Sequence, residues 1–142
     1  LKDKSISLQV ANTLPEGTML KGSRTSFVHS VLSNMVSNAI KFSFSGEAIT
    51  IQAFLNKNKV IIRVIDQGIG MSEEQIKKFY TTEINVSTLG TDGEVGTGLG
   101  LNQLKYFTEK MGGSLEVESK EKAFHQRDFG TKISLEFDSH LN

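Results

Sequence analysis

Residues 23–42 form one long segment in which apolar side chains recur at helical spacing. The apolar positions are Val28, Val31, Leu32, Met35, Val36, Ala39 and Phe42. A helix with a single apolar stripe has to bury that stripe against another element of the fold. Most of the other patterned segments read as strands. The sequence therefore predicts helices that pack on a sheet.

Alternating apolar and polar residues predict the strands of this sheet. The expected strands cover residues 4–10, 18–21, 48–55, 60–65, 114–119 and 131–137. Two shorter helices are expected at Met71–Tyr80, where Ser72 and Gln75 form a capping box, and at Leu99–Met111, which stops at Gly112-Gly113. We therefore predict an α+β fold, an α/β sandwich in which a mixed, mostly antiparallel sheet carries about three helices on one face.

The composition limits the domain organisation and the partners. The chain has 142 residues, which suits one domain over residues 1–142. Its 16 basic and 16 acidic residues give a formal net charge of zero, so nothing favours binding to nucleic acid or to an anionic membrane. There is no cysteine, which excludes disulfides and cysteine-based zinc sites. The first residue is Leu, so we expect the chain to be part of a longer protein.

Three polar residues lie side by side on the long predicted helix. Asn34, Asn38 and Lys41 have the spacing i, i+4, i+7, which places them within an arc of roughly 60°. Amide oxygens suit Mg²⁺, and an ammonium group suits phosphate. The stripe fits the edge of a magnesium–phosphate site, and it also fits an ordinary solvated helix face.

Two glycine-bearing segments could approach a ligand closely. Asp66-Gln67-Gly68-Ile69-Gly70 follows an apolar strand, so its carboxylate could accept a hydrogen bond from an exocyclic amine, or the segment could be a simple turn. Gly96-Thr97-Gly98-Leu99-Gly100-Leu101 opens a helix, where exposed N–H groups favour an anion. This second string matches neither the dinucleotide fingerprint nor the P-loop.

In combination, these segments resemble the catalytic domain of sensor histidine kinases, within the GHKL superfamily. Asn34–Ser43 is similar to the N box of that family, Asp66–Met71 to its G1 box and Gly96–Leu101 to its G2 box. Gly112–Ser119 and Gly130-Thr131 match its closing strands. The resemblance covers almost the whole chain and implies an ATP-dependent protein-histidine kinase domain.

The resemblance also implies roles for the matched positions. Asn38 would bind Mg²⁺ with Asn34 in support, Lys41 would contact phosphate, and Asp66 would accept the amino group of adenine. Thr131 would lie behind the adenine, and the glycine-rich box would hold the phosphates. The residues thus assigned to ATP are Asn34, Asn38, Lys41, Asp66, Gly68, Gly70, Gly96, Thr97, Gly98, Leu99, Gly100, Leu101 and Thr131.

Two features depart from the family pattern. Ile76 and Phe79 occupy the places of two phenylalanines, so one aromatic residue is replaced. The segment 81–97, where the family has a lid, contains no Lys or Arg and carries Glu83, Asp92 and Glu94. A negative lid over a triphosphate costs electrostatic stabilisation. A nucleotide-sensing module with weak or no kinase activity is therefore the alternative function, and a serine-directed kinase of the anti-sigma type ranks last.

No histidine of the chain has the sequence context of a phosphoacceptor. His29, His125 and His140 are the three histidines, and no metal-ligand spacing links them. We therefore expect the acceptor histidine on a separate upstream dimerisation and phosphotransfer domain, with no catalytic residue supplied here. A response regulator receiver domain would be an indirect partner. The domain is expected in the cytoplasm without direct membrane contact, although the parent protein could be membrane-anchored.

Overall fold

A computed structural model describes residues 5–80, 99–120 and 130–141 of the chain. Five strands form one sheet in the order β1-β3-β4-β6-β5. They are β1 (Ser7–Asn12), β3 (Ala48–Asn56), β4 (Lys59–Asp66), β5 (Ser114–Lys120) and β6 (Gly130–Asp138). The β1–β3 pair is parallel and the other pairs are antiparallel. The predicted mixed, mostly antiparallel sheet is confirmed.

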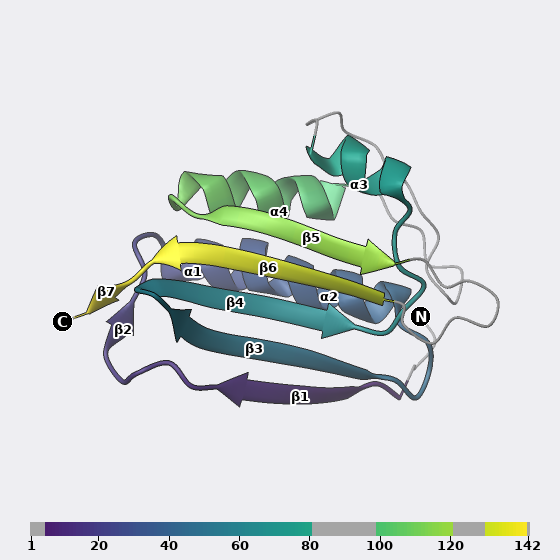
Figure 1. Ribbon diagram of the computed structural model, residues 1–142, viewed down its shortest axis with the longest axis horizontal. Helices are drawn as coiled ribbons and strands as arrows, with labels where there is room; N and C mark the ends of the chain where they lie inside the picture. The colour runs from purple at the N-terminus through teal and green to yellow at the C-terminus, as the bar shows by residue number, and fades with distance from the viewer. Residues whose placement is uncertain (1–4, 81–98, 121–129, 142) are drawn as a thin grey trace.

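Two short strands form a second ribbon at the end of the molecule that holds the C-terminus (Figure 1). β2 (Thr18–Met19) pairs antiparallel with β7 (His140–Leu141). The sequence predicted the first of these strands, at 18–21, and did not predict its partner. Two residues carry too little alternation to indicate a strand from sequence alone.

The helices lie on one face of the sheet (Figure 1). The long predicted helix is present as three consecutive pieces: α1 (Arg24–Ser26), the π-helix η1 (Phe27–Leu32) and α2 (Ser33–Phe42). α3 (Glu73–Tyr80) and α4 (Leu99–Lys110) follow the predicted shorter helices closely. The predicted sandwich of one sheet and one helical layer is therefore correct.

The π-helix changes which apolar residues reach the core. Val31, Met35 and Ala39 are buried as the stripe predicts, whereas Val28 is 41% exposed. A π-helix bonds residue i to i+5, so it holds more residues in a turn than an α-helix does. The side chains before the end of η1 are therefore rotated about the helix axis relative to those of α2. The prediction that Val28 is buried assumed a constant period of 3.6 residues and was wrong.

Local sequence signals fix several of the connections. Lys57 and Asn58 both have positive φ, at 50° and 67°, and form the two-residue turn of the β3–β4 hairpin. Ser72 caps α3 through a bond from the Gln75 N–H to its Oγ (3.1 Å), and the Ser72 N–H donates to Gln75 Oε1 (2.8 Å). The predicted capping box is confirmed.

α4 ends in a Schellman motif at the predicted glycines. The Gly113 N–H donates to the Thr108 carbonyl (2.9 Å), and the Gly112 N–H donates to the Glu109 carbonyl (2.9 Å). Gly112 has φ +80°, which glycine adopts without strain. The chain therefore turns directly from α4 into β5.

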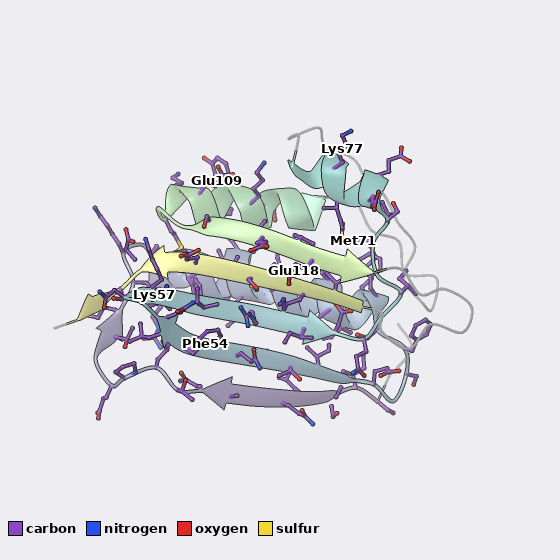
Figure 2. The ribbon with its side chains drawn as sticks, in the orientation of Figure 1. Phe54, Lys57, Met71, Lys77, Glu109 and Glu118 are labelled. Atoms are coloured by element: carbon purple, nitrogen blue, oxygen red, sulfur yellow. The ribbon has the colours of Figure 1, made fainter. Side chains whose placement is uncertain are left out.

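The hydrophobic core lies between the helices and the inward face of the sheet. Its buried members are Val31, Met35, Ala39, Ile49, Val60, Ile62, Val64, Leu104, Val117, Ile133, Leu135 and Phe137. The opposite face carries charged side chains, with Glu118 paired to Lys132 (2.6 Å) and the Arg63 guanidinium 4.9 Å from the centre of the Phe54 ring (Figure 2). Among the described residues, no helix is both long and apolar enough to cross a bilayer.

Candidate nucleotide-binding site

Three neighbouring strands carry a row of polar residues at the same edge of the core. Each strand is apolar along its inward face, as with Val60, Ile62 and Val64 on β4, and is polar at the inward position nearest this edge. That position is Asp66 on β4, Thr131 on β6 and Ser119 on β5. Asp66 is paired with Thr131, and Thr131 with Ser119. The sheet register thus aligns a carboxyl and two hydroxyl groups beside an apolar core.

Asp66 is held by two backbone N–H groups that bond the same carboxyl oxygen. The N–H groups of Gly68 (2.9 Å) and Thr131 (3.2 Å) both donate to Oδ1. Oδ2 accepts no hydrogen bond from the described residues, although Asp66 is only 7% exposed. An ionised carboxylate oxygen that no protein group bonds can accept a donor from water or from a ligand. The site therefore has a place for an N–H or O–H group of a ligand.

Burial raises the pKa of Asp66 from its usual value of 3.8 to about 6. Removal from water disfavours the charged form, and the two bonds from Gly68 and Thr131 oppose this effect by stabilising the carboxylate. At neutral pH the group is ionised. Asp66 is thus an acceptor under ordinary conditions, and it gains a proton in mildly acidic solution.

A cavity opens in front of this carboxyl group, with an empty volume of about 330 Å³ that includes space open to solvent. Most of its wall is apolar, and three polar side chains face it from α2, β4 and β6. The lining residues are Met35, Asn38, Ala39, Phe42, Val64, Asp66, Met71, Thr131 and Ile133. An apolar slot with a few polar groups suits a flat heterocycle that carries an N–H donor.

The glycines of the predicted G1 segment shape this cavity in two ways. A Cβ on Gly68 would lie 2.0 Å from the Phe42 carbonyl oxygen, so only glycine lets the loop approach the end of α2. The neighbouring Ile69 N–H donates to the same oxygen (3.0 Å). Gly70 has φ +75°, a conformation that favours glycine. These glycines allow the loop to pack on the end of α2 beside the cavity.

The predicted helix stripe does not act as one unit. Asn38 lines the cavity, and its buried Nδ2 has no hydrogen-bond partner among the described residues. Lys41 does not line the cavity, and its Nζ lies 4.8 Å from the centre of the ring of Phe42, which does line it. Asn34 does not line the cavity: its Nδ2 donates to the Ser30 carbonyl (2.6 Å) and to Gln103 Oε1 (3.4 Å) on α4.

The glycine-rich box falls mostly outside the described residues. Gly96, Thr97 and Gly98 lie outside the described residues, and so does the whole acidic segment 81–97. Leu99, Gly100 and Leu101 form the first turn of α4, and their side chains lie outside the description. Their predicted contact with phosphates therefore stays a prediction. Ile76 packs against the core in the place of the first F-box phenylalanine.

Sequence reasoning missed Ser119 and Met71. Ser119 Oγ lies within hydrogen-bonding distance of the Met71 N–H, the Gly130 carbonyl and Thr131 Oγ1. Figure 2 shows Met71 beside the C-terminal end of β5. The sequence held a signal for Ser119, because the inward positions Leu115 and Val117 predict that the next inward residue is buried as well. A serine there is a polar residue at a core position.

Solved structures share this fold. The mycobacterial sensor histidine kinase MprB matches with a TM-score of 0.77 and 23% identity, covering 97% of this chain and 85% of that one. The catalytic domain of the histidine kinase ThkA matches with a TM-score of 0.71 and 24% identity, over 95% and 80% of the two chains. At these identities the likeness establishes the fold.

Curated relatives are longer sensor proteins. The sensor protein KdpD of Clostridium acetobutylicum is 31% identical over 108 residues, which are 76% of this chain and 12% of that protein. The sensor histidine kinase YcbM of Bacillus subtilis is 29% identical over 117 residues, 82% of this chain and 38% of that protein. The chain therefore spans well under half the length of these relatives.

A family profile covers most of the chain. Residues 23–141 match the family described as histidine kinase-, DNA gyrase B-, and HSP90-like ATPase. This range contains α1 to β7, the cavity and the polar row. Together with the sensor kinases among its relatives, the match shows that the chain belongs to this family as a GHKL ATP-binding domain of the histidine kinase type.

Proposed function

We propose that this domain binds Mg²⁺-ATP in the cavity and supplies the γ-phosphoryl group to a histidine of a separate dimerisation domain. In that reaction the bond between the γ-phosphorus and the bridging oxygen breaks, a bond from phosphorus to an imidazole nitrogen forms, and ADP leaves. The domain contributes positioning and charge neutralisation, because the imidazole is itself the nucleophile.

The observation that carries this proposal is the buried carboxyl group of Asp66 in an apolar cavity. Adenine offers an exocyclic amine, which can donate to Oδ2, whereas guanine presents a carbonyl oxygen at that position. Oδ1 is already occupied by the N–H groups of Gly68 and Thr131. The carboxylate therefore favours adenine over guanine.

The polar groups of α2 fit a magnesium-bound triphosphate. Asn38 has a buried amide nitrogen with no partner among the described residues, so the cavity needs an oxygen-rich ligand at this point. Asn38 would hold Mg²⁺ through its amide oxygen, and Lys41 would contact a phosphate oxygen. The ion would neutralise charge on the phosphates.

The residue at position 34 supports phosphoryl transfer over hydrolysis. Hydrolysing members of the superfamily carry a glutamate at the position of Asn34, and that carboxylate activates a water. An asparagine amide cannot accept a proton from water. The Asn34 amide is also bonded to Ser30 and Gln103, which fixes its orientation. A kinase does not need a base here.

The test combines binding with transfer. The purified domain is titrated with ATP and GTP in the presence and absence of Mg²⁺, and is then mixed with the dimerisation domain of its parent protein and γ-labelled ATP. We expect a preference for ATP, tighter binding with Mg²⁺ and label on a histidine. Equal binding of ATP and GTP would contradict the role of Asp66, and acid-stable label on serine would contradict the histidine kinase assignment.

A nucleotide-sensing module is the second candidate. The segment 81–97 favours this function, because it carries Glu83, Asp92 and Glu94 and no basic residue. The segment therefore offers no positive side chain to the γ-phosphate. The same experiment separates the two functions. ATP binding without label on the dimerisation domain would support sensing, and transfer at a rate typical of kinases would exclude it.

A further inference from the structure

We propose that Ser119 fixes the direction in which the Thr131 hydroxyl donates its proton, and thereby makes the cavity selective for a purine with a 6-amino group. The inference rests on the proposed function, because it assumes that the base lies against Asp66 and Thr131. It assigns a role to a residue that does not itself line the cavity. Ser119 would be a positioning residue that acts through Thr131.

Three short contacts converge on the Ser119 hydroxyl. The Met71 N–H lies 2.7 Å from Oγ, the Gly130 carbonyl oxygen 3.0 Å and Thr131 Oγ1 2.7 Å. Ser119 and Thr131 are directly opposed on β5 and β6, so the sheet register holds them together. The backbone pairing places the two residues opposite each other, so the contact of their hydroxyl oxygens depends only on the χ1 angles of two short side chains.

The proton count allows one arrangement that satisfies all three contacts. A serine hydroxyl has one proton and two lone pairs. The Met71 amide can only donate and the Gly130 carbonyl can only accept, so Ser119 accepts from the first and gives its single proton to the second. Thr131 must then donate its own proton to the remaining lone pair of Ser119.

The Thr131 hydroxyl is then available to a ligand as an acceptor alone. Thr131 lines the cavity and is 8% exposed, so water does not readily supply a substitute partner. Beside it, Asp66 Oδ2 is also an acceptor when the group is ionised. The polar part of the wall thus offers two neighbouring oxygen acceptors. A 6-amino group can donate to such a pair, whereas a 6-oxo group would place a third acceptor against them.

The experiment measures selectivity, which a purely structural role would not change. The domain is titrated by calorimetry with Mg²⁺-ATP and with Mg²⁺-ITP, whose base carries a 6-oxo group. In Ser119→Ala the Thr131 hydroxyl is released and can turn to donate to the 6-oxo oxygen. We expect the ratio of ATP to ITP affinity to fall by about threefold to tenfold, the value of one hydrogen bond.

Two variants serve as controls. Ser119→Thr keeps the hydroxyl and should keep the ratio of the wild type. Ser114→Ala removes a serine hydroxyl from an exposed position of the same strand and should also leave the ratio unchanged. If Ser119→Ala does not fold, Ser119→Cys replaces it, because a thiol is a weak donor of similar size.

The outcomes separate this inference from the proposed function. If the wild-type domain does not prefer ATP to ITP, the adenine role of the cavity fails. If the wild type prefers ATP and Ser119→Ala keeps the same ratio, the role of Ser119 is overturned and the adenine role stands. A second measurement starts from the variant Thr131→Val, which lacks the hydroxyl group. Adding Ser119→Ala to this variant should leave its ratio of ATP to ITP affinity unchanged. A further change in the ratio would show that Ser119 does not act through the Thr131 hydroxyl.

Discussion

The inward face of the sheet has an apolar middle and a polar end, and the two differ in what they contribute. Ile62 and Leu135 in the middle face side chains of α2 and α4, and their burial stabilises the fold. At the end, Asp66 and Thr131 occupy equivalent inward positions of the same strands. There, burial of a carboxyl group opposes folding and creates a place for a ligand. The proposed binding site is therefore located where the core buries a carboxyl group in place of an apolar side chain.

The largest effect is expected in the apolar middle. Leu135 is fully buried on β6, so Leu135→Ala removes packed methyl groups and leaves a cavity. We expect the free energy of unfolding to fall by about 2–5 kcal/mol. Urea denaturation followed by circular dichroism measures the change. A loss of less than about 1 kcal/mol would show that the middle of the sheet can collapse around the missing side chain.

At the polar end of the sheet, a substitution is expected to raise the free energy of unfolding instead of lowering it. The pKa of Asp66 is raised in the folded state, so the contribution of this group to stability is most favourable below pH 3.8 and falls as the pH rises from 3.8 to about 6. The ionised group costs up to about 3 kcal/mol at neutral pH. Asp66→Asn keeps an oxygen for Gly68 and Thr131, so it should stabilise the nucleotide-free domain at neutral pH while weakening the preference for ATP.

Thermal unfolding at several pH values tests this prediction. The stabilities of the wild type and Asp66→Asn should converge as the pH is lowered toward 4, where the wild-type carboxyl group is protonated. ATP affinity of the wild type should decrease over the same range, because Oδ2 then carries a proton. A variant that is less stable than the wild type at neutral pH would mean that the carboxylate contributes favourably to the empty domain.

The smallest effect is expected at the edge of the sheet that the helices do not cover. Val10 on β1 is 66% exposed and Leu8 is 54% exposed. Val10→Ser should change the free energy of unfolding by no more than about 0.5 kcal/mol. The same urea titration gives the value. A larger loss would show that another chain or a second copy covers β1 in solution.

Much of the fold could be predicted, because it depends on signals from residues that are neighbours in the sequence. Features that depend on how distant segments pair could not be predicted in this way. The capping box of α3 and the glycines after α4 depend on neighbouring residues, so they were readable in the sequence. Asp66 and Asn38 were predicted through the family resemblance, and the cavity brings both together. Ser119 was missed, because its role depends on the register that places it opposite Thr131. The exposure of Val28 was missed because the sequence does not mark η1.

The bond between the Ile69 N–H and the Phe42 carbonyl has a mechanical consequence. It joins the loop that follows Asp66 to the last turn of the helix that carries Asn38. Asn38 and Phe42 are four residues apart, which is about 6 Å along a helix axis. In the proposed binding mode, the helix would therefore fix the distance between the group that contacts the base and the group that holds the magnesium ion. A nucleotide whose base and phosphates are spaced differently would then satisfy only one of the two groups.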